Sequence, residues 1–137
     1  MKRLIFLSLM LILSTSCSLK DDGEDFNLEI LPIESVDIPD SFTYGETYPI
    51  TVSYLRPSTC HSFKEFYYLK NDNERTVAVI DYAFIDDNCT DLENETVEAT
   101  FNFIVTMNSG SYIFKFWQGT DENDVDQFLT IEVPVTN

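Results

Sequence analysis

Hydrophobic and polar residues alternate along most of the chain from residue 26 onward. In the segment 47–55 apolar side chains occupy every second position, and the segments 96–106 and 127–135 repeat this pattern. A period of two residues is typical of a β-strand that has one buried face and one solvated face. The pattern therefore predicts a strand in each of these three segments.

Three further segments are rich in the aromatic and β-branched residues that favour strands: 62–69, 75–84 and 111–117. A first strand is expected in two parts, 26–31 and 34–38, interrupted by Pro32. Turn-forming residues separate the segments, and no stretch from residue 26 onward has the period of a helix. About seven strands at this spacing predict an all-β fold, an antiparallel β-sandwich over 26–137.

The composition is that of one small globular domain. Of the 137 residues, 44% are hydrophobic and 14% are aromatic, whereas glycine and proline are scarce. A disordered chain, a collagen or a repeat array would have a different composition. The net charge is −16, with 24 acidic residues against 8 basic ones. Binding to nucleic acid depends on Lys and Arg that neutralise phosphates, so the charge argues against nucleic acid as a partner.

The first residues have the features of a secretory signal. Lys2 and Arg3 precede an apolar run over 4–13, and small residues lead to Cys17. The run is too short to span a bilayer as a helix. A cysteine at the cleavage point resembles a bacterial lipoprotein signal, although Ser14 stands where that family usually has Leu. The resemblance implies a signal peptide over 1–16 and a lipid on Cys17 that anchors the protein to a membrane. Ordinary secretion without a lipid is the alternative.

An acidic tether is expected over 17–25, between the lipid and the domain. Lys20, Asp21 and Asp22 resemble the surface-export signal of Bacteroidota lipoproteins, which follows the lipidated cysteine. The resemblance implies the outer membrane and exposure on the cell surface. The other reading is a plain acidic linker, which its like charges keep extended and solvated. The chain as a whole is similar to small outer-membrane lipoproteins of Bacteroidota, which implies a location and a fold and no activity.

The remaining two cysteines, Cys60 and Cys89, are expected to form a disulfide, because exported proteins meet an oxidising compartment. In the chain-entropy model this loop stabilises the fold by about 3–4 kcal/mol. No metal is expected, because His61 is the only histidine and a structural zinc site takes four ligands. A thiol nucleophile is the weaker reading, because adjacent Cys60 and His61 side chains diverge in an extended chain.

The sequence Asn-Ser-Gly-Ser-Tyr over 108–112 resembles the entry to strand F of immunoglobulin-like and fibronectin-like sandwiches. In those folds a tyrosine after a glycine turn ties its hydroxyl back to the loop. The resemblance makes 111–117 strand F and 127–135 strand G. Two antiparallel strands separate the cysteines, so their bond should join loops at one end of the sandwich and should not cross the core.

One sheet is predicted to present an aromatic outer face that serves as a ligand-binding surface. With alternate residues of 111–117 in the core, Trp117 faces outward and Phe128 lies beside it. In the immunoglobulin order the strand 62–69 neighbours strand F, so Phe66 and Tyr68 are expected on the same face. Exposed apolar patches often mark binding sites. The alternative is that other parts of the chain cover this face.

No motif points to catalysis. With 24 acidic residues some pair always resembles a glycosidase dyad, and nothing singles out two of them. The acidic stretch 121–126 fails the EF-hand calcium pattern, because Val125 stands where an acid is required. No catalytic residue, cofactor or metal is therefore predicted. The sequence favours a lipid-anchored, non-catalytic interaction module that docks to another envelope protein; a surface glycan-binding lipoprotein is the alternative, and an enzyme comes third.

Overall fold

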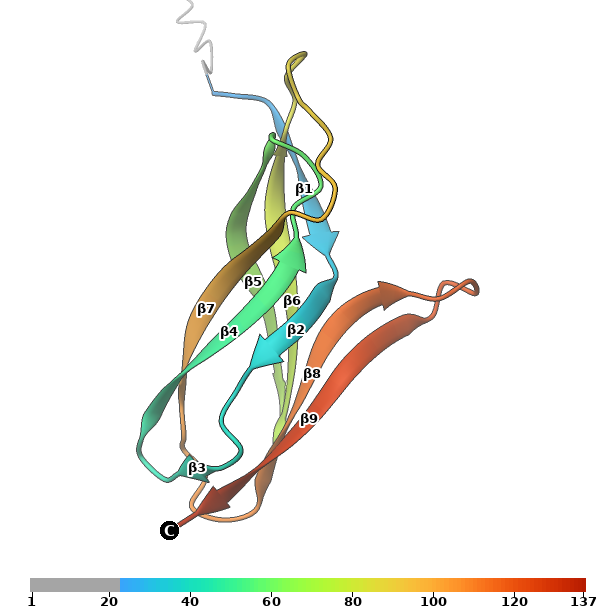
Figure 1. Ribbon diagram of the computed structural model, residues 1–137. Coiled ribbons are helices and arrows are strands. Elements are labelled where there is room, and N and C mark those ends of the chain that lie inside the picture. Colours follow the sequence, from blue (N-terminus) through green and yellow to red (C-terminus); the bar gives the residue numbers. More distant parts are fainter. Residues whose placement is uncertain (1–22) are drawn as a thin grey trace, which may run out of the picture.

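The computed structural model describes residues 23–137, which form strands and no helix. The strands pack as two sheets in two layers (Figure 1), so the predicted all-β sandwich is confirmed at this level. The strands are β1 (Phe26–Leu31), β2 (Ile33–Asp37), β3 (Phe42–Thr43), β4 (Thr47–Leu55), β5 (His61–Asn71), β6 (Glu74–Phe84), β7 (Thr96–Ile104), β8 (Ser111–Thr120) and β9 (Asp126–Thr136).

The larger sheet has six strands and the smaller sheet has three. In the larger sheet β5 pairs with one edge of β6, while β1 and β8 share the other edge, and β9 and β3 follow β8. Along β6, β1 pairs with the half that ends at Phe84 and β8 pairs with residues 74–77. The smaller sheet has the order β2-β4-β7. This arrangement leaves β5 and β7 as edge strands on the same side of the sandwich, as Figure 1 shows.

The first strand is interrupted at Pro32, as the sequence predicted, and the chain changes sheets there. Leu31 ends the pairing of β1 with β6, and Ile33 begins the pairing of β2 with β4. Proline has no N–H to donate to a neighbouring strand, so a break in strand pairing at this residue loses the fewest hydrogen bonds. Leu31 and Ile33 on either side of it are buried in the core.

The core is an aromatic cluster between the two sheets. Tyr112, Phe114 and Phe116 alternate along β8 and are fully buried, as the period of two requires. The rings of Tyr112 and Phe114 contact both Phe42 and Phe103, and the centroid of Phe114 lies 6.1 Å from that of Phe42 and 5.1 Å from that of Phe103. The Phe116 ring stacks on Phe114. Aromatic side chains bury large apolar areas, so this cluster contributes a major part of the stabilisation of the fold.

The predicted tie between Tyr112 and the loop before it is present. The Tyr112 hydroxyl accepts hydrogen bonds from the backbone N–H groups of Thr106 and Met107, at 3.0 and 2.9 Å. Gly110 has a φ of 83°, the left-handed conformation that the turn before the strand needs. The antiparallel pairing of β8 with β9, with Trp117 opposite Phe128, also follows the prediction.

The expected neighbour of β8 was wrong. We expected the strand 62–69 beside 111–117, but β6 lies there, and it pairs with β8 in parallel. The amino-acid compositions of β5 and β6 explain why β6, and not β5, lies beside β8. The centre of β6 is continuously apolar over 77–80, which suits a strand with neighbours on both edges. Charged Lys64, Glu65 and Lys70 along β5 suit an edge, where charges discourage further pairing.

The predicted disulfide between Cys60 and Cys89 is confirmed, with a Cα–Cα distance of 5.5 Å. It joins the segment before β5 to the loop after β6, at one end of the sandwich and outside the core. Backbone hydrogen bonds join the same two segments, from Thr59 N–H to the Thr90 carbonyl and from Leu92 N–H to the Pro57 carbonyl, at 3.0 and 2.9 Å. We call this end of the sandwich the disulfide pole.

Candidate functional site

The residues predicted to anchor and export the protein lie outside the described residues. These are Cys17, Lys20, Asp21 and Asp22. Among residues 23–137 there is no helix of the length and hydrophobicity that crossing a membrane requires. Lipid attachment and surface export therefore remain predictions from the sequence.

The four aromatic residues predicted to share one face lie on two different faces. Trp117 and Phe128 are cross-strand partners on the outer side of the larger sheet. Phe66 and Tyr68 lie on the inner side, because their register partners on β6 are the buried Val79 and Val77. The prediction of a single ligand-binding face with all four residues was wrong in this respect.

Tyr67 is the residue of β5 that joins Trp117 on the outer side. Its partner on β6 is Ala78, and together with Ile30 and Trp117 these residues line a shallow hollow with a volume of about 290 Å³. The hollow lies where β8 diverges from β6 and β1 takes its place. The Trp117 indole donates a hydrogen bond to the Asp126 carboxylate at 2.9 Å, which fixes the ring across the β8–β9 hairpin.

Strand β1 adds a row of exposed apolar side chains to the same outer side. Phe26, Leu28 and Ile30 alternate along β1, and each is about half exposed. The Phe26 ring meets Tyr82 edge-on, with centroids 4.8 Å apart. We define the outer apolar face as Phe26, Leu28, Ile30, Tyr67, Leu69, Tyr82 and Trp117. The alternation at 26, 28 and 30 was visible in the sequence, but the strand that pairs with β1 was not.

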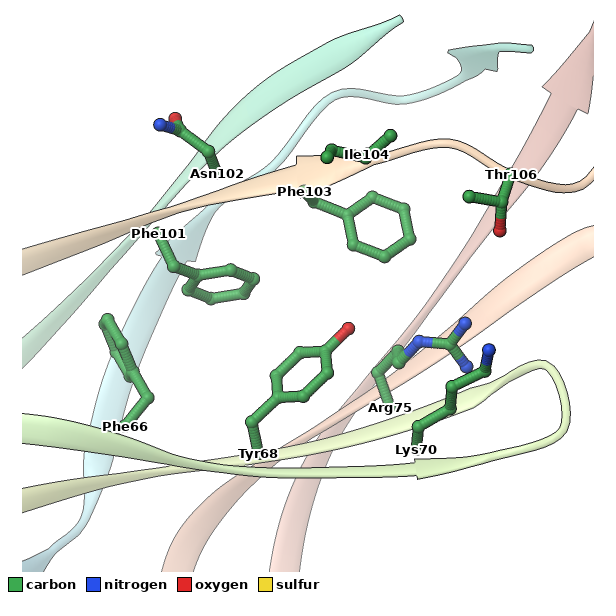
Figure 2. A pocket seen from close by; sticks show the side chains of 9 residues that line it. All are labelled: Phe66, Tyr68, Lys70, Arg75, Phe101, Asn102, Phe103, Ile104 and Thr106. Carbon is green, nitrogen blue, oxygen red and sulfur yellow. The ribbon is translucent and has the colours of Figure 1, made fainter. Parts of the chain in front are cut away.

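Phe66 and Tyr68 line a cleft on the opposite side of β5. The cleft lies between β5 and β7 and has a volume of about 440 Å³. In Figure 2 the rings of Phe66 and Tyr68 point toward Phe101 and Phe103 of β7. We call it the β5–β7 cleft, and its lining residues are Phe66, Tyr68, Lys70, Arg75, Phe101, Asn102, Phe103, Ile104 and Thr106. It exists because the two edge strands face each other with no further strand to close the gap.

A buried arginine forms the inner wall of the cleft. Arg75 is 4% exposed, and its Nη1 donates to the carbonyls of Asp72 and Glu74 at 2.7 and 2.8 Å. Its guanidinium carbon lies 5.2 Å from the centre of the Tyr112 ring and 5.9 Å from that of Phe103. Burial raises the pKa of the Tyr68 hydroxyl, and the positive charge of Arg75 acts in the opposite direction. The arginine therefore combines hydrogen bonds and cation–π contacts.

The disulfide pole holds a chain of polar side chains that sequence analysis did not find. His61 Nδ1 lies 2.7 Å from the Ser58 hydroxyl, and His61 Nε2 lies 2.7 Å from a Glu29 carboxylate oxygen. A serine, a histidine and an acid in this order resemble a hydrolase triad. However, Ser58 is 6% exposed and its hydroxyl accepts the Cys60 N–H at 3.1 Å. A nucleophile must reach its substrate, so this chain fits a structural role that shapes the turn.

Asp81 is the most deeply buried acid beside this chain. It is 0% exposed, and its Oδ1 accepts a hydrogen bond from the Tyr54 hydroxyl at 2.9 Å. No described residue bonds to its Oδ2. Burial raises the pKa of Asp81, while the Tyr54 hydrogen bond and the charges of His61 and Arg56 act to lower it. Burial also raises the pKa of Tyr54, and Asp81 adds to this effect.

Residues 23–137 contain no cluster of three or more His, Cys, Asp or Glu side chains placed to hold a metal ion. The geometry therefore offers two surfaces with the character of binding sites, the outer apolar face and the β5–β7 cleft. Comparisons of the chain with protein-family models, with curated proteins and with solved structures found no match.

Proposed function

We propose that this protein is a non-catalytic interaction module that docks to another protein of the cell envelope. The observation that carries the proposal is the outer apolar face. Its exposed apolar side chains come from β1 and β5, and half-buried rings of β6 and β8 in the same sheet extend it. Contiguous apolar patches on a soluble surface mark interaction sites, because leaving them in water is unfavourable.

The chemistry of this face favours a protein partner. Leu28, Ile30 and Leu69 contribute aliphatic surface between the aromatic rings, and such mixed surfaces resemble the cores of protein interfaces. A sugar would use flat aromatic rings without the aliphatic side chains, so the glycan-binding alternative has less support on this face. The net charge of −16 opposes both an anionic membrane surface and a second copy of the chain.

The partner should carry an apolar patch with a basic rim. Asp126 lies at the edge of the face, where it holds the Trp117 indole, and the chain as a whole has 24 acidic residues against 8 basic ones. Acidic groups at the edge of an apolar face favour basic residues on the partner, because complementary potentials speed association and exclude partners of like charge.

The proposal includes a lipid on Cys17 and a place on the outer membrane, exposed at the cell surface. The N-terminal signal features, and Lys20, Asp21 and Asp22 after the cysteine, support it. It also includes a relationship to immunoglobulin-like sandwiches, which the Tyr112 tie and the β8–β9 hairpin support. The parallel pairing of β6 with β8 departs from that fold.

Site-specific photo-crosslinking in cells tests the docking surface. A photoreactive residue replaces Leu28 on the outer apolar face or Leu55 on the smaller sheet, which is also exposed. We expect Leu28 to give one discrete protein adduct that Leu55 does not give. The purified partner should then bind the chain less tightly, by about tenfold or more, when Ile30→Ser and Tyr67→Ser are combined.

The matched control is Tyr44→Ser, because Tyr44 is an exposed tyrosine in the turn after β3. This variant should bind the partner like the wild type. The docking proposal is wrong if Leu28 and Leu55 give the same adducts, or if the adducts contain only lipid or a second copy of the chain. Equal effects of the patch variant and the control would also contradict it.

A further inference from the structure

The β5–β7 cleft is separate from the outer apolar face, since the two lie on opposite sides of β5. It combines aromatic walls with positive charge. Phe66 and Phe101 meet edge-on at one end, with centroids 5.0 Å apart, and Phe103 lies farther along β7. Lys70 and Arg75 stand on the β5–β6 side of the cleft in Figure 2. A volume of about 440 Å³ is within the range of small-molecule sites.

The charge of the cleft is opposite to that of the protein. The chain has 24 acidic residues and 8 basic ones. Two of the basic residues, Lys70 and Arg75, line the cleft, and no Asp or Glu is among its lining residues. A low-dielectric recess lined by one sign of charge concentrates ligands of the opposite sign. The cleft is therefore a local anion-attracting site on an acidic protein.

Arg75 lacks the partner that a buried cation usually has. The ion pairs among residues 23–137 join Arg56 to Glu95, His61 to Glu29, and Lys64 to Glu65, and none includes Arg75. A charge taken out of water needs compensation, and here two backbone carbonyls and two aromatic rings supply part of it. An anion bound in the cleft would complete the compensation of the Arg75 charge.

We propose that the β5–β7 cleft binds an acidic sugar ring. The carboxylate of the sugar accepts hydrogen bonds from Arg75 and lies within reach of the Lys70 charge, since guanidinium groups match carboxylates in shape and charge. The apolar face of the ring stacks on Tyr68, which is 45% exposed. The hydroxyl of Tyr68 is available to the sugar hydroxyl groups.

A sugar acid fits this cleft better than an extended peptide. A peptide that adds to an edge strand takes its hydrogen bonds from the strand backbone. The residues of the cleft instead offer side chains, with rings on both walls and charges at one end. Hydroxyl groups on the ligand also match the Tyr68 hydroxyl, which an apolar carboxylate would leave without a ligand partner.

Titration calorimetry on the full chain in detergent tests the proposal. The probes are a trisaccharide of galacturonic acid and the matched trisaccharide of galactose, which has the same ring and no carboxylate. At physiological salt the acidic probe should bind at least tenfold more tightly. Arg75→Lys keeps the charge and removes the planar donor set, and should weaken binding by about tenfold. Lys70→Gln changes an exposed residue and should weaken it by about threefold.

The matched control is Lys115→Gln, because Lys115 lies on β8 beside Phe128, outside the cleft. It removes the same charge and should leave binding unchanged. Equal binding of the two probes, or no binding of the acidic probe, overturns the proposal. If Lys70→Gln and Lys115→Gln weaken binding equally, the effect comes from the net charge of the protein and not from the cleft, which would also overturn the proposal. Tighter binding of a peptide that ends in phenylalanine would assign the cleft to a protein terminus instead. Lys70→Gln decides the matter even if Arg75→Lys fails to fold.

Discussion

Arg75 and Asp81 are two buried ionisable residues on the same face of one strand, β6, and they lie at opposite ends of the sandwich. Arg75 is 4% exposed and Asp81 is 0% exposed. Arg75 donates two hydrogen bonds to backbone carbonyls and lies against two aromatic rings. Asp81 accepts one hydrogen bond from Tyr54, and its second oxygen has no partner among the described residues.

The difference lies in what each charge can do when it is buried. Arginine stays protonated at every ordinary pH, so its surroundings have to accommodate a charge. A carboxyl group in the same situation can take up a proton and become neutral. The Arg75 end of β6 therefore keeps a permanent charge, while the Asp81 end responds to pH. Four predictions test this contrast, ordered from the largest effect to the smallest.

Loss of the disulfide should loosen the Asp81 end of β6 far more than the Arg75 end. The double variant Cys60→Ala with Cys89→Ala should lower the free energy of unfolding by about 3–4 kcal/mol. The Phe84 N–H bonds to the Cys60 carbonyl at 3.0 Å, so its hydrogen exchange should accelerate. Exchange at Val77 should change only with global stability. If hydrogen exchange at Phe84 and at Val77 accelerates by the same factor, the effect of the disulfide is not local and the prediction is wrong.

Removing the Tyr54 hydroxyl should show how much this hydrogen bond stabilises the buried Asp81 carboxyl group. Tyr54→Phe leaves the buried carboxyl without its hydrogen bond, and should destabilise the fold by about 1–3 kcal/mol. The hydrogen bond lowers the pKa of Asp81, so its loss penalises the ionised form most. Chemical denaturation should therefore show a larger loss at pH 7 than at pH 4. Tyr48→Phe is the control, because within residues 23–137 the Tyr48 hydroxyl bonds only to an exposed backbone N–H.

Asp81 should make the protein less stable as the pH rises. Burial raises its pKa in the folded state above the ordinary value of 3.8. The folded state thus holds the proton more tightly, and this stabilisation is complete below the unfolded pKa and is lost as the pH rises through the folded pKa. Asp81→Asn should remove that slope. The comparison with the wild type isolates Asp81 from the repulsion among the other acids, and parallel slopes would refute its role.

The strands and their inner residues were predictable from the sequence, because the period of two reports directly on burial. Tyr112, Phe114 and Phe116 were expected inside and are fully buried. The tie from the Tyr112 hydroxyl and the Cys60–Cys89 bond were also predicted and found. Each of these features depends on contacts within a short segment or on a residue type with only one plausible partner.

The order of the strands and the location of the binding surfaces were not predictable in the same way. Alternation shows which residues share a face, and it does not show which strand lies next to which. A bulge between Phe63 and Glu65 adds a residue to β5, so Phe63 and Phe66 lie on the same side with centroids 5.0 Å apart. The residue of β5 that faces outward near Trp117 is therefore Tyr67. The burial of Arg75 was not predictable either, because a charged residue at the start of an apolar strand is normally expected in solvent.

Removal of the Arg75 charge should have the smallest effect on stability and a large effect on the proposed sugar binding. Arg75→Met replaces the side chain with an apolar one of similar length. Because no carboxylate pairs with Arg75 among the described residues, the substitution leaves no opposite charge stranded in the core. The desolvation cost of the guanidinium disappears along with its two hydrogen bonds and ring contacts, so we expect a net loss of less than about 1 kcal/mol. Thermal unfolding at pH 7 measures this change, and a loss as large as that of Tyr54→Phe would mean that the charge is a structural requirement of the fold. A small loss of stability together with lost galacturonate binding would instead show that Arg75 serves ligand binding more than folding. The two ends of β6 would then differ in role, since the buried Asp81 sets the pH dependence of stability and the buried Arg75 binds the ligand.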